Sequence, residues 1–338
     1  MKVSVVMPVY NGGERMRRTL DSVLAQTWRD FELVCVDDGS TDGISAAILD
    51  EYAGRDGRIE VVHQTNQGSC AAKNKALRIA QGDFVVRCDQ DDLMHPQELE
   101  FCVNASREHD LDFLSFRYKR MPKDGAMPVF EDVLHHVGEV VAWDAKRQEM
   151  DPLGYRRSMR LVHTDSWAQF VRRDLAVATP IAEDWELARP FKLIRMSRRW
   201  ASTVHALYFY DDSVPTSMTR SPFTLKKLRL IRDDLRNVFD LYEDVRDAGD
   251  PFGEWDELCR SYVTSKIKSA LNKIRRGRRR KTIGKADAAA LFKELAGIVH
   301  EVFFEQGVPF RYASLRHQLS YLWLMFKYRN YISEVRNG

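Results

Sequence analysis

Apolar and polar residues alternate in two different rhythms along the first 118 residues. Short apolar runs, typical of buried strands, occur at 3–7, 31–36, 59–63, 84–87 and 113–118. Segments with apolar residues three or four positions apart, typical of helices, lie between them at 14–26, 44–52, 69–80 and 96–107. Because strands alternate with helices, the sequence predicts an α/β fold with a mostly parallel central sheet flanked by helices.

The pattern becomes helical after about residue 220. A long amphipathic helix is predicted over 225–245, and a stripe of leucine and aromatic residues with helical spacing follows at 315–326. We therefore divide the chain into an α/β region, residues 1–220, and a helical C-terminal extension, residues 221–338. The last stripe fits core packing or a homodimer contact, and it also fits docking on a membrane surface.

The formal net charge of +3 conceals an asymmetry between these two regions. Residues 221–338 contain 23 Lys and Arg against 15 Asp and Glu, whereas residues 1–220 contain 29 against 34. Seven of the nine residues from Lys273 to Lys281 are basic, which is typical of a solvated surface and also of sites that bind anionic lipid headgroups. The acidic first region argues against a nucleic-acid-binding protein.

The cysteines and the hydropathy pattern limit where the protein can work. Five cysteines are scattered without the spacing of a zinc site or a disulfide framework. No run of about 18 apolar residues occurs, and the first apolar run is too short for a signal peptide. We therefore expect a cytoplasmic protein with reduced thiols, which is neither exported nor membrane-spanning and contacts the inner face of the cell membrane at most peripherally.

Acidic residues follow two of the predicted strands. Asp37 and Asp38 follow the run at 31–36, and Asp89, Asp91 and Asp92 follow the run at 84–87. Loops after parallel strands meet at one edge of the sheet, where ligands bind in open α/β folds. Crowded carboxylates repel one another unless a cation lies among them, which favours Mn²⁺ or Mg²⁺ with substrate phosphate as a further ligand. An Asp-rich turn that only caps the next helix is the structural alternative.

The sequence lacks the loop motifs of two common classes of phosphate-binding protein. Neither GxGxxG nor GxxxxGK[ST] follows the first predicted strand. A dinucleotide-binding dehydrogenase or a P-loop NTPase would need one of these loops. The turn after Pro8 also lacks the Gly-rich, Lys-bearing loop that a nucleotidyltransferase normally uses.

The motifs in the α/β region occur in a familiar order. They are the strand and loop at 5–11, the helix at 20–27, the acidic strand end at 36–42, Asn-Gln-Gly at 66–68 with Ala-Lys-Asn at 72–74, and Asp-Gln-Asp-Asp at 89–92. This order resembles the inverting glycosyltransferases of family 2, which have the nucleotide-diphospho-sugar transferase (GT-A) fold. The resemblance covers roughly residues 1–220. It implies a nucleotide-sugar-binding half at 1–118 and an acceptor and catalytic half at 119–220.

The resemblance implies roles for residues of the first half. Tyr10 would stack on the base, most often uracil, and Asp38 would accept a hydrogen bond from the base or ribose, although an ordinary core role for Tyr10 and a helix cap at Asp38 are the alternatives. Asp91 would ligate the metal, and Asp89 would hold ribose or metal. The remaining donor-binding residues are implied to be Pro8, Val9, Asn11, Gln90 and Lys73. Lysine at position 73 departs from the usual arginine, so the forked contact is lost while the charge is kept.

The resemblance also assigns the chemistry of the second half. Residues 181–187 are similar to the family's ED motif, which makes Asp184 the general base beside Glu183, although two acids at a helix start can serve the helix dipole alone. Trp167 lies in a segment that resembles the acceptor side, with plain core packing as the alternative. Thr219 and Arg220, in the loop at 213–220, would approach the diphosphate.

The resemblance therefore implies an enzyme with one reaction. An inverting, metal-dependent hexosyl- or N-acetylhexosaminyltransferase would move sugar from a nucleotide-diphosphate sugar, UDP-linked in most relatives, to a glycan or lipid-linked acceptor in surface polysaccharide synthesis. The competing hypothesis is a non-catalytic scaffold of the same fold that is recruited to membrane or partner through its basic helical extension.

Overall fold

The computed structural model describes residues 1–122, 126–162, 167–181, 188–213, 222–329 and 332. The chain separates into two compact units, Met1–Pro215 and Thr216–Gly338. Each unit is described by itself.

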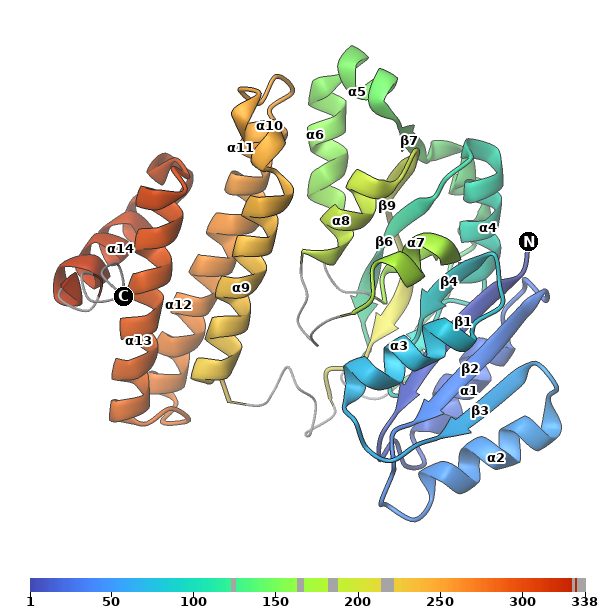
Figure 1. Cartoon of the computed structure of the whole chain (residues 1–338). Helices are drawn as coiled ribbons and strands as arrows, with labels where there is room; N and C mark the ends of the chain where they lie inside the picture. The colour runs from blue at the N-terminus through green and yellow to red at the C-terminus, as the bar shows by residue number, and fades with distance from the viewer. Residues whose placement is uncertain (123–125, 163–166, 182–187, 214–221, 330–331, 333–338) are drawn as a thin grey trace. The chain divides into compact units, whose positions relative to one another are not determined.

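The first half of the first unit is a parallel α/β sheet (Figure 1). Its strands are β1 (Val3–Val9), β2 (Phe31–Asp37), β3 (Ile59–His63) and β4 (Phe84–Arg87), and they lie in the order β3-β2-β1-β4. The connecting helices are α1 (Met16–Leu24), α2 (Ser45–Arg55) and α3 (Ser69–Ile79). These strands and helices agree with the predicted alternation, with helix ends that differ from the prediction by a few residues.

The second half of the sheet is mixed. Strand β8 (Gln169–Arg172) runs antiparallel between β4 and β6 (Phe113–Arg120), and β6 pairs in parallel with β9 (Trp200–Tyr210). Two short strands, β5 (Leu93–Met94) and β7 (Val141–Trp143), pair antiparallel with β9. The described residues thus form a nine-stranded sheet. The predicted α/β fold with a helical extension is confirmed, and its parallel character is concentrated in β1 to β4.

Several helices and a close turn at Gly82 complete the first unit. The helices are α4 (Glu98–His109), η1 (Leu134–Glu139), α5 (Ala145–Met150), α6 (Pro152–Leu161), α7 (Arg173–Ala178) and α8 (Arg189–Met196). Strand β1 is buried on both faces, as parallel strands covered by helices are. Gly82 makes the close turn from α3 into β4, because a Cβ there would lie 2.6 Å from the backbone nitrogen of Ser4.

The second unit is helical. Its elements are α9 (Leu225–Leu241), α10 (Glu243–Asp247), α11 (Glu254–Leu258), η2 (Cys259–Val263), α12 (Thr264–Arg279), α13 (Lys285–His300), η3 (Glu301–Glu305), η4 (Phe310–Tyr312) and α14 (Leu315–Lys327). Leu235 of α9, Leu271 of α12 and Leu295 of α13 are among its buried residues. The basic run that begins at Lys273 forms the last turns of α12, where positive charge is favourable to the helix dipole. Among the described residues, no helix combines the length and apolar character needed to cross a bilayer.

Candidate active site

The loops that follow β1 and β2 are held together by Asn11. Its side-chain oxygen accepts the backbone N–H groups of Thr41, at 2.7 Å, and Asp42, at 3.2 Å. Its own N–H donates to the hydroxyl of Ser40 at 3.0 Å. The φ angle of Asn11 is 51°, a left-handed value that asparagine tolerates better than most residues. The structure therefore gives this predicted donor-binding residue a positioning role between two loops.

Gln90 joins the β1 loop to the loop after β4. Its amide oxygen accepts the N–H of Tyr10 at 2.8 Å, and its amide nitrogen donates to the carbonyl of Tyr10 at 3.0 Å. The hydroxyl of Thr19, on α1, donates to the Gln90 carbonyl at 3.0 Å. With its backbone fixed in this way, Tyr10 is 46 % exposed, so its ring is presented at the carboxyl end of the sheet.

Asp38 is buried and fully engaged within the protein. One of its carboxylate oxygens accepts from the Gln64 side chain, at 2.7 Å, and from the Gln67 N–H, at 2.8 Å. The other accepts the Gly68 N–H at 2.8 Å. The backbone N–H of Asp38 donates to Val9, next to Pro8 at the end of β1. Asp38 thus fixes the loop that leads into α3, and the predicted contact with a base stays a prediction.

The acidic loop after β4 holds two kinds of carboxylate. Asp92 is fully buried and accepts from the Tyr208 hydroxyl at 2.8 Å and from the Asp211 N–H at 2.7 Å. The same Tyr208 hydroxyl accepts the N–H of Asp89 at 2.9 Å. Burial, followed by the charges of Asp91 and Asp89, raises the pKa of Asp92 well above its usual range. Asp92 therefore ties the loop to β9.

Asp89 and Asp91 are the carboxylates that remain for a ligand. Burial, together with the charges of Asp89 and Asp211, raises the pKa of Asp91 to about 6. Asp89 is partly exposed, and its oxygen lies 3.3 Å from the Nε of Arg87. Oxygen ligands that repel one another suit a hard divalent cation, whose charge would offset that repulsion. The residues present therefore fit the predicted Mn²⁺ or Mg²⁺.

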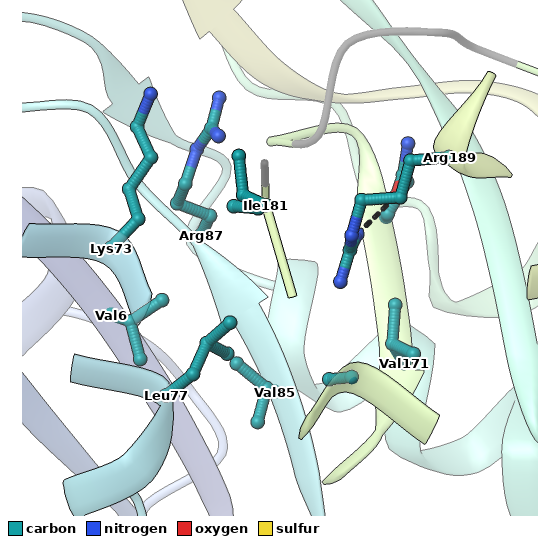
Figure 2. Close-up of a pocket in the computed structure, with 10 residues that line it drawn as sticks. Val6, Lys73, Leu77, Val85, Arg87, Val171, Ile181 and Arg189 are labelled. Atoms are coloured by element: carbon teal, nitrogen blue, oxygen red, sulfur yellow. Dashed lines mark hydrogen bonds between the residues drawn. The ribbon is translucent and has the colours of Figure 1, made fainter. Parts of the chain in front are cut away.

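Three cationic side chains line a pocket of the first unit (Figure 2). Lys73 of α3, Arg87 of β4 and Arg189 of α8 line it together with an apolar floor that includes Val85 and Val171. Each of the three cations is less than 10 % exposed. Arg189 donates to the Gln169 side chain at 3.0 Å and to the Thr179 carbonyl at 3.1 Å. Positive charge in a partly buried pocket favours an anionic group.

Asn74, the residue after Lys73, connects α3 to the second half of the site. The amide of Asn74 accepts the N–H of Ile181 at 2.8 Å and donates to the Ile181 carbonyl at 2.7 Å. Ile181 is also in the pocket lining. The predicted catalytic pair, Glu183 and Asp184, follows in residues 182–187, which lie outside the described residues, as do Thr219 and Arg220.

Trp167 is a buried member of an aromatic cluster. It is 6 % exposed and stacks on Tyr208 with ring centroids 4.7 Å apart. Tyr118 meets it edge-on at 4.8 Å. The Trp167 indole therefore packs against Tyr208, whose hydroxyl is hydrogen-bonded to Asp89 and Asp92. Its predicted place beside an acceptor stays a prediction.

Some residues that build the site were not identified from the sequence. Tyr208, Asn74 and Arg18 hold its loops, and Arg18 donates to the Asp91 carbonyl at 2.9 Å and pairs with Asp211. Asn74 belongs to a motif that the sequence does show. Tyr208 and Arg18 carry no local signal, because their partners lie far away along the chain.

A second group of residues could hold a metal ion elsewhere in the first unit. His136 and Glu139 of η1 and His205 of β9 have ligand atoms that all lie within 4.8 Å of one another. The His136 and His205 rings stack with centroids 4.1 Å apart. This group lies on different elements from the loop that carries Asp89 and Asp91.

The fold is that of a GT-A type glycosyltransferase. Over 100 % of this chain and 92 % of the other, it resembles the crystal structure of S. aureus TarS residues 1–349 in complex with UDP-GlcNAc, with a TM-score of 0.63 and 18 % sequence identity. Residues 4–145 match the model of glycosyl transferase family 2. The resemblance that the motifs predicted is confirmed over these residues.

Curated relatives match over a limited part of their length. The uncharacterized glycosyltransferase YibD of Escherichia coli is 36 % identical over 111 residues, which are 33 % of this chain and 32 % of YibD. The poly(ribitol-phosphate) beta-N-acetylglucosaminyltransferase TarP of Staphylococcus aureus is 33 % identical over 135 residues, which are 38 % of this chain and 41 % of TarP. These matches support the resemblance to glycosyltransferases rather than a particular substrate.

Proposed function

We propose that this protein is an inverting, metal-dependent glycosyltransferase that moves a sugar from a UDP-linked donor to a glycan or lipid-linked acceptor in surface polysaccharide synthesis. The carrying observation is the pairing of Asp89 and Asp91 in a partly buried loop that Gln90 fastens to the backbone of Tyr10. The residues that we propose as metal ligands and as the base-stacking ring therefore belong to two loops that Gln90 joins. Two relatives support the choice of sugar nucleotide, since TarS was crystallised with UDP-GlcNAc and TarP is named an N-acetylglucosaminyltransferase.

The donor would lie across the carboxyl ends of β1, β2 and β4. The exposed ring of Tyr10 would stack on uracil, with stacking of about 1–3 kcal/mol per base as the expected contribution. Asn11 and Asp38 would shape the base pocket by fixing the three loops, with Pro8 and Val9 as its wall. Lys73 would attract the diphosphate from the cationic pocket. Asp89 and Asp91 would hold the cation, which supplies charge stabilisation to the departing diphosphate when bound.

One displacement accounts for the reaction. The acceptor hydroxyl oxygen forms a bond to the anomeric carbon while the bond from that carbon to the diphosphate oxygen breaks, and the nucleoside diphosphate leaves with the electron pair. Asp184 takes the hydroxyl proton as general base, and Glu183 belongs to the same segment. Asn74 supports this assignment, because it fixes Ile181, three residues before Asp184, beside the Lys73 helix. A single displacement inverts the anomeric configuration.

Calorimetric titration with UDP, with and without Mn²⁺, tests the proposal. We expect Mn²⁺ to tighten UDP binding at least about tenfold, and we expect Asp91→Ala to abolish that effect because the ion loses a ligand. Asp184→Asn should keep metal-dependent UDP binding and lose transfer, measured as UDP release with acceptor present. Asp240→Ala removes an exposed acid of α9 and is the matched control. Equal UDP affinity with and without metal in the unmodified protein would contradict the proposal.

A further inference from the structure

Helix α14 presents a continuous apolar stripe outward. Tyr321 and Leu324 are fully buried on one face, and the hydroxyl of Ser320 accepts from Arg275 of α12 at 3.0 Å. Five other large apolar side chains are exposed, with exposed fractions from 47 % to 71 %: Leu315, Leu319, Leu322, Trp323 and Phe326. Their spacing of three and four positions places them along one side of the helix, which we call the α14 stripe.

Positive charge surrounds the α14 stripe. The sequence contains no Asp or Glu from residue 306 to residue 333, while it contains Arg311, Arg316, Lys327 and Arg329. Lys327 lies 4.6 Å above the ring of Trp323, and Arg329 lies 5.1 Å above the ring of Phe326. These two cations therefore lie directly against aromatic rings of the α14 stripe.

The neighbouring helix adds like charge. Arg275 of α12 lies beside α14, and its pKa is lowered by burial and by the nearby charge of Arg316. Lys268 also contributes positive charge near His317 of α14. Within the described part of the chain, Lys268, Arg275 and Arg316 form no ion pair with a carboxylate. A cluster of like charges without acid is stabilised by a partner that brings negative charge.

The chemistry of the stripe selects among partners. A second copy of the chain would bring the same cations against these, and like charges oppose each other across an interface. A nucleic acid would meet the cations but would leave leucine side chains without an apolar partner. An anionic bilayer surface would accommodate both the apolar side chains and the cations. Leucine and tryptophan would enter the headgroup boundary, while lysine and arginine would reach the headgroup phosphates.

We infer that α14 docks the protein on the surface of an anionic membrane, with the α14 stripe inserted at the headgroup boundary and Arg316 and Lys327 on lipid phosphate. The sequence pointed to the basic run that begins at Lys273 as well as to this stripe. That run forms the end of α12, and its two non-basic residues, Ile274 and Gly277, are buried, so it offers charge without an apolar surface. The inference adds a location to the proposed function. Its test needs no transfer, so the two can fail separately.

Vesicle flotation of the full chain tests the inference. The vesicles are phosphatidylcholine alone, or phosphatidylcholine with about one third phosphatidylglycerol, each at low and high salt. Leu315→Ser with Phe326→Ser removes two exposed members of the stripe, and Arg316→Gln with Lys327→Gln removes its charge. Val129→Ser with Met150→Ser is the apolar control, since both side chains are also exposed, and Arg279→Gln with Lys281→Gln is the charge control. Circular dichroism confirms that each variant is folded.

We expect binding to the anionic vesicles that salt weakens, and little binding to neutral ones. The stripe and charge variants should each bind at least about tenfold more weakly, since each basic residue near an anionic surface contributes on the order of a fivefold change, whereas both controls should bind like the unmodified chain. Three results would overturn the inference: no binding to anionic vesicles, loss with the Arg279 and Lys281 control alone, or a concentration-dependent dimer in size-exclusion chromatography that the stripe variant abolishes.

Discussion

Glu98 illustrates how a single residue can respond to pH away from the acidic loop. It is the first residue of α4, it is fully buried, and within the described part of the chain no cation pairs with it. Burial raises the pKa of its carboxyl well above 4.5. The helix N-terminus favours the ionised form, but only modestly, so desolvation decides the direction of the shift.

The stability of the protein should therefore depend on pH through Glu98. Between pH 4.5 and the raised pKa, the folded state keeps a proton that the unfolded chain releases, so the free energy of unfolding falls as pH rises through this window. Glu98→Gln should remove this loss. We expect the stability of the variant relative to the unmodified protein to grow by up to about 1.4 kcal/mol per pH unit within the window, measured by urea unfolding at pH 5 to 8.

A matched substitution isolates the effect of burial at this position. Glu100→Gln changes a partly exposed acid in the same helical turn. Its stability difference should stay constant across the same pH range. A constant difference for Glu98→Gln as well would show that the carboxyl is not held protonated.

Contacts between elements show what sequence reasoning could reach and what it could not. The four parallel strands and their helices follow from local periodicity, and the acidic loop was found because three aspartates follow β4 within five residues. Periodicity could not show that β8 enters antiparallel between β4 and β6, because register and partner depend on packing over long distances. For the same reason the hydrogen bonds from the loop before α3 to Asp38 could not be predicted, while the predicted contact of Asp38 with the base stays a prediction.

Asn74 joins α3 to the segment before α8, so its substitution tests a contact between two elements of the fold. Asn74→Ala removes two hydrogen bonds to Ile181, which leaves a buried N–H and carbonyl to find other partners. We expect a loss of about 1–3 kcal/mol in the free energy of unfolding, measured with urea. Transfer should fall more than metal-dependent UDP binding, because Ile181 belongs to the segment that leads to the proposed general base.

Asn237→Ala is the control for this substitution, because Asn237 is an exposed asparagine of α9. It should leave stability, UDP binding and transfer unchanged. If Asn74→Ala weakened UDP binding and transfer equally, Asn74 would act on the donor half of the site instead.

The whole molecule consists of two units with different charge and different architecture. The first unit contains its own sheet core and all the described residues that we assign to donor and metal, and the second is helical and basic. Four of the five cysteines are buried and all are free.

The first unit should therefore bind the donor nucleotide by itself. A fragment of residues 1–220, which keeps the loop with Thr219 and Arg220, should show metal-dependent UDP binding within about threefold of the full chain, because its carboxylates and loops are held by contacts inside the unit. Calorimetry measures this, and Asp91→Ala in the fragment is the control. A folded fragment that binds no UDP would show that residues beyond 220 complete the nucleotide site.

The double contact between Gln90 and Tyr10 has a consequence for the order in which ligands can act. Since one amide couples the loop of the carboxylates to the loop of the ring, an occupant of either loop restrains the other. Reciprocity then requires that nucleotide tighten the ion by the same factor as the ion tightens nucleotide. At low concentrations of each ligand, the ternary complex would therefore form cooperatively.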